Sequence, residues 1–132
     1  NKHGSFNISE LFRILKTGGI FITQQVGAEN DKELIELLLP KTELSFPDLY
    51  LKNISKKFKE TGFKILQEQE AFRPIKFYDI GALVWYAHII EWEFPNFSVS
   101  NCLENLFKAQ RILEKQGVVE GKIHRFLIVA QK

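Results

Sequence analysis

Residues 7–26, NISELFRILKTGGIFITQQV, decide the fold because they predict a helix, a tight turn and a buried strand in immediate succession. Asn7 can cap the helix, and Glu10 can complete a capping box with it. Gly18 can adopt the left-handed conformation that ends the helix, and residues 20–25 are predicted to form a strand covered on both faces. The helix is also predicted by four apolar side chains whose spacing places them on one face of a helix: Ile8, Leu11, Phe12 and Leu15.

Two amides, Gln24 and Gln25, close this strand. The carboxyl end of a buried parallel strand is the place where open α/β sheets bind ligands. We therefore expect both side chains to offer hydrogen bonds to a substrate. The alternative is that they supply only surface or capping polarity.

Hydrophobic patterning predicts two further strands. Half-polar alternation over residues 63–70 is typical of an edge strand. The unbroken apolar run within residues 123–130 favours an interior strand that is covered on both faces. Residues 73–78 are expected to be a connector, and residues 118–121 a turn.

Helical spacing predicts four more helices, each with a candidate N-cap. One begins near Asn30 and ends before Pro40, and another, over residues 49–61, follows Asp48. A third helix, over residues 80–91, follows Asp79. The fourth ends at Gln116 and begins after Ser98 or Ser100.

Composition limits the class of protein. A chain of 132 residues is one domain or a piece of one, and 45% hydrophobic residues exclude general disorder. A net charge of +2 is too small to indicate a nucleic acid or a membrane surface as partner.

The single cysteine, Cys102, excludes an internal disulfide and is expected to be a small buried residue. There is no apolar run of about 20 residues and no leader, so we expect a cytoplasmic protein. The spacing of the three histidines predicts no metal site.

The opening stretch also carries a family resemblance. Residues 10–19 match the pattern E-x-x-R-x-L-K-x-G-G, and an apolar strand follows. This resembles the segment that enters the fifth strand of class I S-adenosylmethionine-dependent methyltransferases, although Thr17 stands where that family usually has proline. The stretches TQQVGAEN, FYDIGALVWY and PNFSV are similar to a UbiE-like bacterial branch of the superfamily. The resemblance covers nearly the whole chain but only the second half of such an enzyme.

The resemblance implies an α/β fold. We expect a partial Rossmann-like methyltransferase sheet of about three strands, with the last strand inserted antiparallel between the other two. Residues 1–132 would form a single C-terminal half-domain, beginning just after a fourth strand. A helical insertion at about residues 78–117 would form a lid over the substrate side.

The resemblance also implies roles for particular side chains. Asn1 and His3 lie in the segment NKHGSF, which in the family lines the cofactor and substrate cavity. We expect Asn1 and His3 to touch the cofactor, and His3 to act as a base or an orienting group. From the residues alone, His3 could equally be an exposed loop histidine. Four aromatic side chains are expected to wall an apolar substrate pocket, with core packing as the alternative: Tyr78, Trp85, Tyr86 and Trp92.

The functional expectation is the acceptor side of a methyltransferase that transfers a methyl group from S-adenosylmethionine to a small molecule. No G-x-G motif occurs in the chain, so we expect it to bind S-adenosylmethionine weakly or not at all by itself, and to be inactive alone. An uncovered strand edge at residues 20–25 predicts homo-oligomers through that edge or the nearby apolar face. The alternative is a stand-alone α/β module that binds a small ligand or a protein without catalysis.

Overall fold

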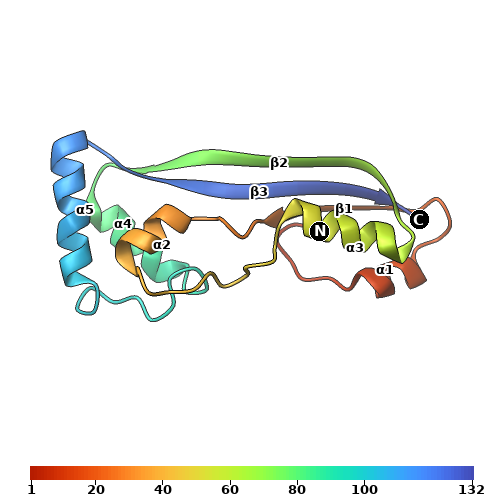
Figure 1. Cartoon of the computed structure of the whole chain (residues 1–132), viewed down its shortest axis with the longest axis horizontal. Helices are drawn as coiled ribbons and strands as arrows, with labels where there is room; N and C mark the ends of the chain where they lie inside the picture. Colours follow the sequence, from red (N-terminus) through yellow and green to blue (C-terminus); the bar gives the residue numbers. More distant parts are fainter. The chain divides into compact units, whose positions relative to one another are not determined.

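The computed structural model describes all residues, Asn1–Lys132, and they group into two compact units. The first unit consists of Asn1–Asn30, Phe46–Phe72 and His124–Lys132, and the second of Asp31–Ser45 and Arg73–Ile123. Figure 1 shows the elements in chain order: α1 (Ile8–Ile14), β1 (Ile20–Val26), α2 (Lys32–Leu38), α3 (Leu51–Thr61), β2 (Lys64–Phe77), α4 (Ile80–Ile89), α5 (Leu103–Gln116) and β3 (Val119–Gln131).

The sheet has three strands in the order β1-β3-β2. β3 runs antiparallel to β1, with a register that extends from Ile20 opposite Gln131 to Val26 opposite Arg125. The last strand of the chain therefore lies between the other two, which confirms the predicted partial methyltransferase-type α/β sheet. α4 and α5 stand between β2 and β3 in sequence, where the helical insertion was predicted.

One face of the sheet is packed within the first unit. Its core is formed by Phe58 of α3, by Phe63, and by Phe126, Ile128 and Ala130 of β3. Side chains of α1 pack against this cluster, and α1 also contacts α3. The two helices thus supply the apolar cover for alternate residues of the strands.

The other face of β1 is not covered, which corrects the expectation of a strand buried on both sides. Ile20 is 51% exposed and Ile22 is 53% exposed, whereas Thr23 and Gln25 on the opposite face are buried. Their partners in β3 show the same alternation, with Val129 half-buried next to the buried Ile128. Apolar character alone could not reveal this, because a run such as IFIT does not say which face has a neighbour.

β2 and β3 are both longer than predicted. The expected connector at residues 73–78 continues β2 as far as Phe77, and the expected turn at residues 118–121 contains the start of β3 at Val119. Pro74, which has no backbone N–H, lies within β2. An edge strand such as β2 tolerates proline, since one side of its backbone has no partner.

A second core lies within the second unit. It is built around Leu34 and Leu38 of α2, Leu83 of α4 and Ala109 of α5, all of which are fully buried. α5 contacts both α2 and α4. Cys102 is buried at the edge of this core, as predicted.

Two of the predicted N-caps are confirmed. The Asn7 side chain accepts the Glu10 backbone N–H at 3.0 Å, and the Asp79 side chain accepts the Ala82 N–H at 2.7 Å. The helices that were assigned to Asn30, Asp48 and the serines begin later, after Asp31, Tyr50 and Cys102. None of the five helices combines the length and the apolar character that crossing a bilayer requires.

Candidate functional site

The first residues of the chain pair with the outer edge of β1. The Asn1 amino group donates to the Ile22 carbonyl at 2.9 Å, and the Gln24 N–H donates to the Asn1 carbonyl at 3.1 Å. The His3 N–H donates to the Gln24 carbonyl at 2.8 Å, and Lys2 forms a parallel bridge with Gln24. The structure therefore brings together three predicted site residues: Asn1, His3 and Gln24.

Gln25 is held on the packed face of β1 and is only 7% exposed. Its Nε2 lies within hydrogen-bond distance of Asn1 Oδ1 (3.1 Å), the Gly4 carbonyl (3.1 Å) and Thr23 Oγ1 (2.7 Å). Gln24 projects from the opposite face, because neighbouring residues of a strand alternate. The two amides therefore do not act as a pair: Gln25 fixes the first residues of the chain, and Gln24 lies on the uncovered face.

His3 is an exposed residue with a positive φ of 56°. Partial burial lowers its pKa, and the positive charges of Arg125 and Lys2 lower the pKa further. The imidazole is therefore uncharged at neutral pH and has a nitrogen lone pair that can accept a proton.

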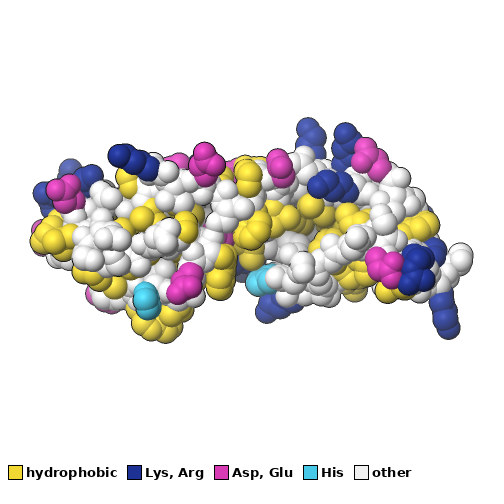
Figure 2. Space-filling view, turned by 90° about the horizontal axis from the view of Figure 1, so that it is seen from below, with side chains coloured by type: hydrophobic (Ala, Val, Ile, Leu, Met, Phe, Trp, Pro, Cys, Tyr) yellow, Lys and Arg dark blue, Asp and Glu magenta, His cyan; other side chains and the backbone are white.

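The four predicted pocket aromatics belong to the second unit. Tyr78, Trp85 and Trp92 are 69%, 65% and 60% exposed, and they are among the hydrophobic side chains that reach the surface; Figure 2 shows such side chains scattered between charged ones. Tyr86 differs, because its hydroxyl donates to Asp31 Oδ2 at 2.8 Å and its ring packs near Phe77.

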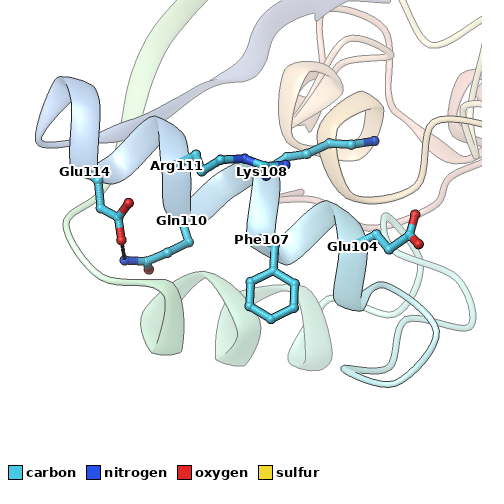
Figure 3. Close-up of a pocket in the computed structure, with 6 residues that line it drawn as sticks. All are labelled: Glu104, Phe107, Lys108, Gln110, Arg111 and Glu114. Carbon is cyan, nitrogen blue, oxygen red and sulfur yellow. Dashed lines mark hydrogen bonds between the residues drawn. The ribbon is translucent and has the colours of Figure 1, made fainter.

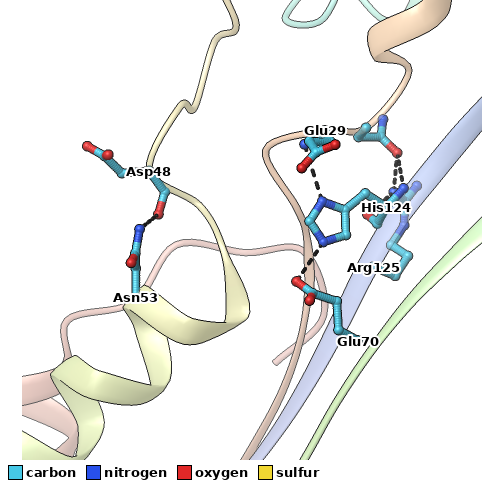
Figure 4. A network of polar contacts seen from close by, with 7 residues as sticks. Glu29, Asp48, Asn53, Glu70, His124 and Arg125 are labelled. Atoms are coloured by element: carbon cyan, nitrogen blue, oxygen red, sulfur yellow. Dashed lines mark hydrogen bonds and ion pairs between the residues drawn. The ribbon is translucent and has the colours of Figure 1, made fainter.

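His124 is the centre of a polar network that the sequence analysis missed (Figure 4). The side chain is fully buried, and its Nε2 lies 2.9 Å from Glu70 Oε1. Its Nδ1 accepts the Glu29 backbone N–H at 3.2 Å, and its ring stacks on Phe72 with centroids 4.3 Å apart. Gly27 must lack a side chain here, because a Cβ would lie 2.2 Å from the imidazole.

The contacts of His124 fix its tautomer. Because Nδ1 accepts an N–H, the proton of the neutral ring lies on Nε2 and is donated to the Glu70 carboxylate. Both ring nitrogens are thus engaged. His124 is therefore an anchor that holds Glu29 and Glu70 in place, rather than a base with a free lone pair.

Arg125 is held by the same network. The Asn30 side-chain oxygen accepts the His124 backbone N–H at 3.1 Å and also accepts Arg125 Nη1. The same Nη1 donates to the His124 carbonyl at 2.8 Å. Asn30 is only 4% exposed, so the guanidinium is attached to a buried side chain of the first unit.

Tyr50 adds a hydroxyl group beside this network. Burial raises its pKa, and the charge of Glu29, a hydrogen bond to Glu29 and the charge of Glu70 raise the pKa further. The phenol therefore stays protonated and can donate. The Ala28 N–H donates to the Leu49 carbonyl at 2.9 Å, which holds the loop after β1 beside the start of α3. A sequence signal existed: Gly27 and Glu29 follow the carboxyl end of the strand, where ligand sites form.

Two surface hollows lie in the second unit. One, of about 480 Å³, follows α5 alone, where Gln110 bonds to Glu114 at 2.9 Å (Figure 3). Another, of about 380 Å³, is lined by residues between Ala87 and Phe97. Neither hollow is lined by the predicted site residues. We therefore place the candidate site at the carboxyl end of β1, on the residues it gathers: Asn1, Lys2, His3, Gln24, Glu29, Tyr50, Glu70, His124 and Arg125.

Comparison with known proteins gives a fold but no family. No model of a known protein family matches the sequence, and no curated protein matches it. The structure of a "putative methyltransferase" from Bacillus halodurans C-125 matches with a TM-score of 0.53 and 17% identity, covering 95% of this chain and 56% of that chain. The cyclase SpnF matches with a TM-score of 0.43 and 16% identity, covering 95% of this chain and 42% of that chain.

The first of these matches shows the class of fold. The chain has a methyltransferase-like fold, and it spans little more than half the length of the Bacillus protein. At this level of identity the likeness concerns the backbone arrangement alone. The match to SpnF is too distant to support an argument.

Proposed function

We propose that this chain is the C-terminal, acceptor-side part of an S-adenosylmethionine-dependent methyltransferase of the UbiE-like branch, acting in the cytoplasm on a small molecule. The observation that carries the proposal is the partial match: 95% of this chain aligns with 56% of a methyltransferase-like chain. The parallel bridge between Lys2 and Gln24 supports it, because a strand running ahead of Asn1 would continue along β1 in the same direction. Residues 1–132 would then act as one half-domain.

The 132 residues by themselves do not fit the methyl donor. Gly18 has a φ of 78° in the turn into β1, and a Cβ on Gly19 would lie 2.8 Å from the Lys16 carbonyl oxygen. These glycines therefore serve a tight helix-to-strand turn and leave no loop open to a nucleotide. The donor supplies the methyl group, and its main contacts would come from outside these residues.

The residues of this chain would act on the acceptor. Methyl transfer needs an oriented nucleophile in a site from which water is excluded. Gln24 would hydrogen-bond the acceptor, and the uncharged His3 would take its proton. Asn1 and His3 would lie nearest the donor. Four aromatic side chains of the helical insertion would contact the apolar part of the acceptor: Tyr78, Trp85, Tyr86 and Trp92.

We also propose that the isolated chain forms homo-oligomers. The exposed side chains of Ile20 and Ile22 lie on an uncovered sheet face, and Asn1–His3 pair with the outer edge of β1 only from the Ile22 carbonyl onward. Such an edge and such a face are sites of association between copies. Sedimentation that finds only compact monomers at high concentration would refute this.

Calorimetry with S-adenosylmethionine tests the functional proposal. We expect no measurable heat of binding for this chain, and saturable binding for a protein that also contains the sequence encoded ahead of Asn1. Tight binding by the 132 residues alone would contradict the account. A reading frame that starts near Asn1 would favour the stand-alone binding module instead.

A further inference from the structure

Two cationic side chains lie on the uncovered face of the sheet at the carboxyl end of β1. Lys2 is opposite Gln24, and Arg125 is opposite Val26. Cross-strand partners project from the same face, and so do residues two apart on one strand. All four side chains therefore share the face opposite the buried Gln25. Two strand spacings, about 10 Å, separate the backbones that carry Lys2 and Arg125, a gap that their long side chains can close over Gln24.

The Arg125 guanidinium is oriented but not saturated. Its hydrogen bonds, to Asn30 Oδ1 and to the His124 carbonyl, both use Nη1. Nε and Nη2 remain, and together they form the side-on edge of the guanidinium. That edge presents two parallel N–H donors, the arrangement that binds two oxygens of one oxyanion.

The chain provides no counterion for this patch. Its ion pairs involve other cations, namely Arg13, Lys56, Lys59, Lys76 and Lys122. Of the two carboxylates of the network, Glu70 is engaged by His124 and Glu29 by the Tyr50 hydroxyl. The lowered pKa of His3 reflects burial and the charges of Arg125 and Lys2, which places its ring within the field of both. An uncharged imidazole adds one more donor or acceptor to the patch.

We propose that Arg125, with Lys2 and His3, binds the oxyanion group of a small molecule, a carboxylate or a phosphate. This proposal rests on the proposed function and specifies its substrate class. The acceptor would carry an anionic group, and binding of that group would place the reacting atom near His3. Gln24 between the two cations would provide a neutral hydrogen bond to the same molecule.

Nuclear magnetic resonance of this chain tests the inference with two probes, sodium benzoate and sodium phosphate, each compared with sodium chloride at equal ionic strength. We expect the Arg125 Nε–H signal to shift saturably with one of the two probes, and which probe does so identifies the anion. Arg125→Lys keeps the charge but loses the two parallel N–H donors of the guanidinium, so binding of the anion should weaken about tenfold. Lys2→Gln should weaken it about threefold.

Arg111→Lys is the matched control, because Arg111 is an exposed arginine of α5 and its loss should leave binding unchanged. Shifts that sodium chloride reproduces, or wild-type affinity in both Arg125→Lys and Lys2→Gln, would overturn the inference. Lys2 is exposed, so Lys2→Gln should fold even if Arg125→Lys does not. Because the test needs no methyl donor, anion binding without donor binding in the longer protein would refute only the proposed function. Donor binding by the longer protein without anion binding by this chain would refute only this inference.

Discussion

The fully buried imidazole of His124 donates to a Glu70 carboxylate oxygen 2.9 Å away, which joins β3 to β2 beneath the end of β1. The opposite ring nitrogen accepts the Glu29 backbone N–H at 3.2 Å, and this fixes the loop that leaves β1. One side chain thus connects the three strands at the edge where the candidate site lies. The geometry of that site depends on this connection.

Replacing His124 with alanine should destabilise the chain by about 2–4 kcal/mol. The substitution leaves a cavity beneath Phe72 and removes the partners of the Glu29 N–H and the Glu70 carboxylate. Urea unfolding at neutral pH measures the loss. His88→Ala is the control, because His88 is exposed on α4. Equal stability of the two variants would show that the network contributes nothing.

Replacing Gly27 with alanine should cost about 1–3 kcal/mol. The new methyl group would lie 2.2 Å from the His124 ring, so the ring or the strand end must move. Gly4→Ala is a mild comparison, since the nearest atom to its Cβ lies 3.4 Å away. In the double variant with His124→Ala the clash disappears. The double variant should therefore lose less stability than the sum of the losses of the two single variants. Full additivity in thermal unfolding would contradict the close contact.

Two isoleucines on neighbouring strands should respond differently to truncation. Ile128→Ala removes a fully buried side chain and should cost about 2–5 kcal/mol. Ile22→Ala removes a side chain that is 53% exposed and should cost less than about 1 kcal/mol in the monomer. Ile22→Ala should also weaken self-association in sedimentation experiments. A large stability loss at Ile22 in the monomer would show that the face is covered.

Stability should fall in acid partly through Glu33. Burial acts to raise the pKa of its carboxyl, but the hydrogen bonds and the charge of Lys122 outweigh burial and hold the pKa below its usual value. A lowered folded-state pKa stabilises the fold above the unfolded-state pKa, and this contribution disappears as the pH falls through the folded-state pKa. Because the Glu33 side chain is 40% exposed, the contribution should stay below about 1 kcal/mol. Glu33→Gln should therefore be less stable than the wild type at neutral pH, and this difference should disappear once the pH has fallen below the folded-state pKa of Glu33, as measured by urea unfolding. A difference that persists in strong acid would contradict this assignment.

Much of the fold followed from local patterns. Asn7 and Asp79 were recognised as caps because a side-chain acceptor before an apolar helical run satisfies free N–H groups. The interior position of β3 followed from its apolar run together with the family resemblance. The open face of Ile20 and Ile22 could not be predicted, because burial of a strand face depends on elements far away in the sequence. Asp31, an N-cap with a left-handed backbone, was missed because that conformation is rare for a residue with a side chain.

The candidate site was predicted only in part. Asn1, His3 and Gln24 were singled out, and the structure brings them together at the edge of β1. His124 was examined only for metal-ligand spacing. Its partner Glu29 is 95 residues away in sequence, and no periodicity connects them. Arg125 was missed for the same reason, since its value as a donor depends on the buried Asn30.

We propose that a strand from outside these residues completes the sheet at β1 in a longer protein, and amide hydrogen exchange at Ile22 tests this most directly. Along β1, the Gln24 N–H already bonds to the Asn1 carbonyl, so a parallel strand would next reach the Ile22 N–H. We expect this amide to exchange rapidly in the monomeric chain, and at least about a hundredfold more slowly when the sequence encoded ahead of Asn1 is present. An Ile22 amide as protected in the isolated monomer as that of Ile128 would contradict the account.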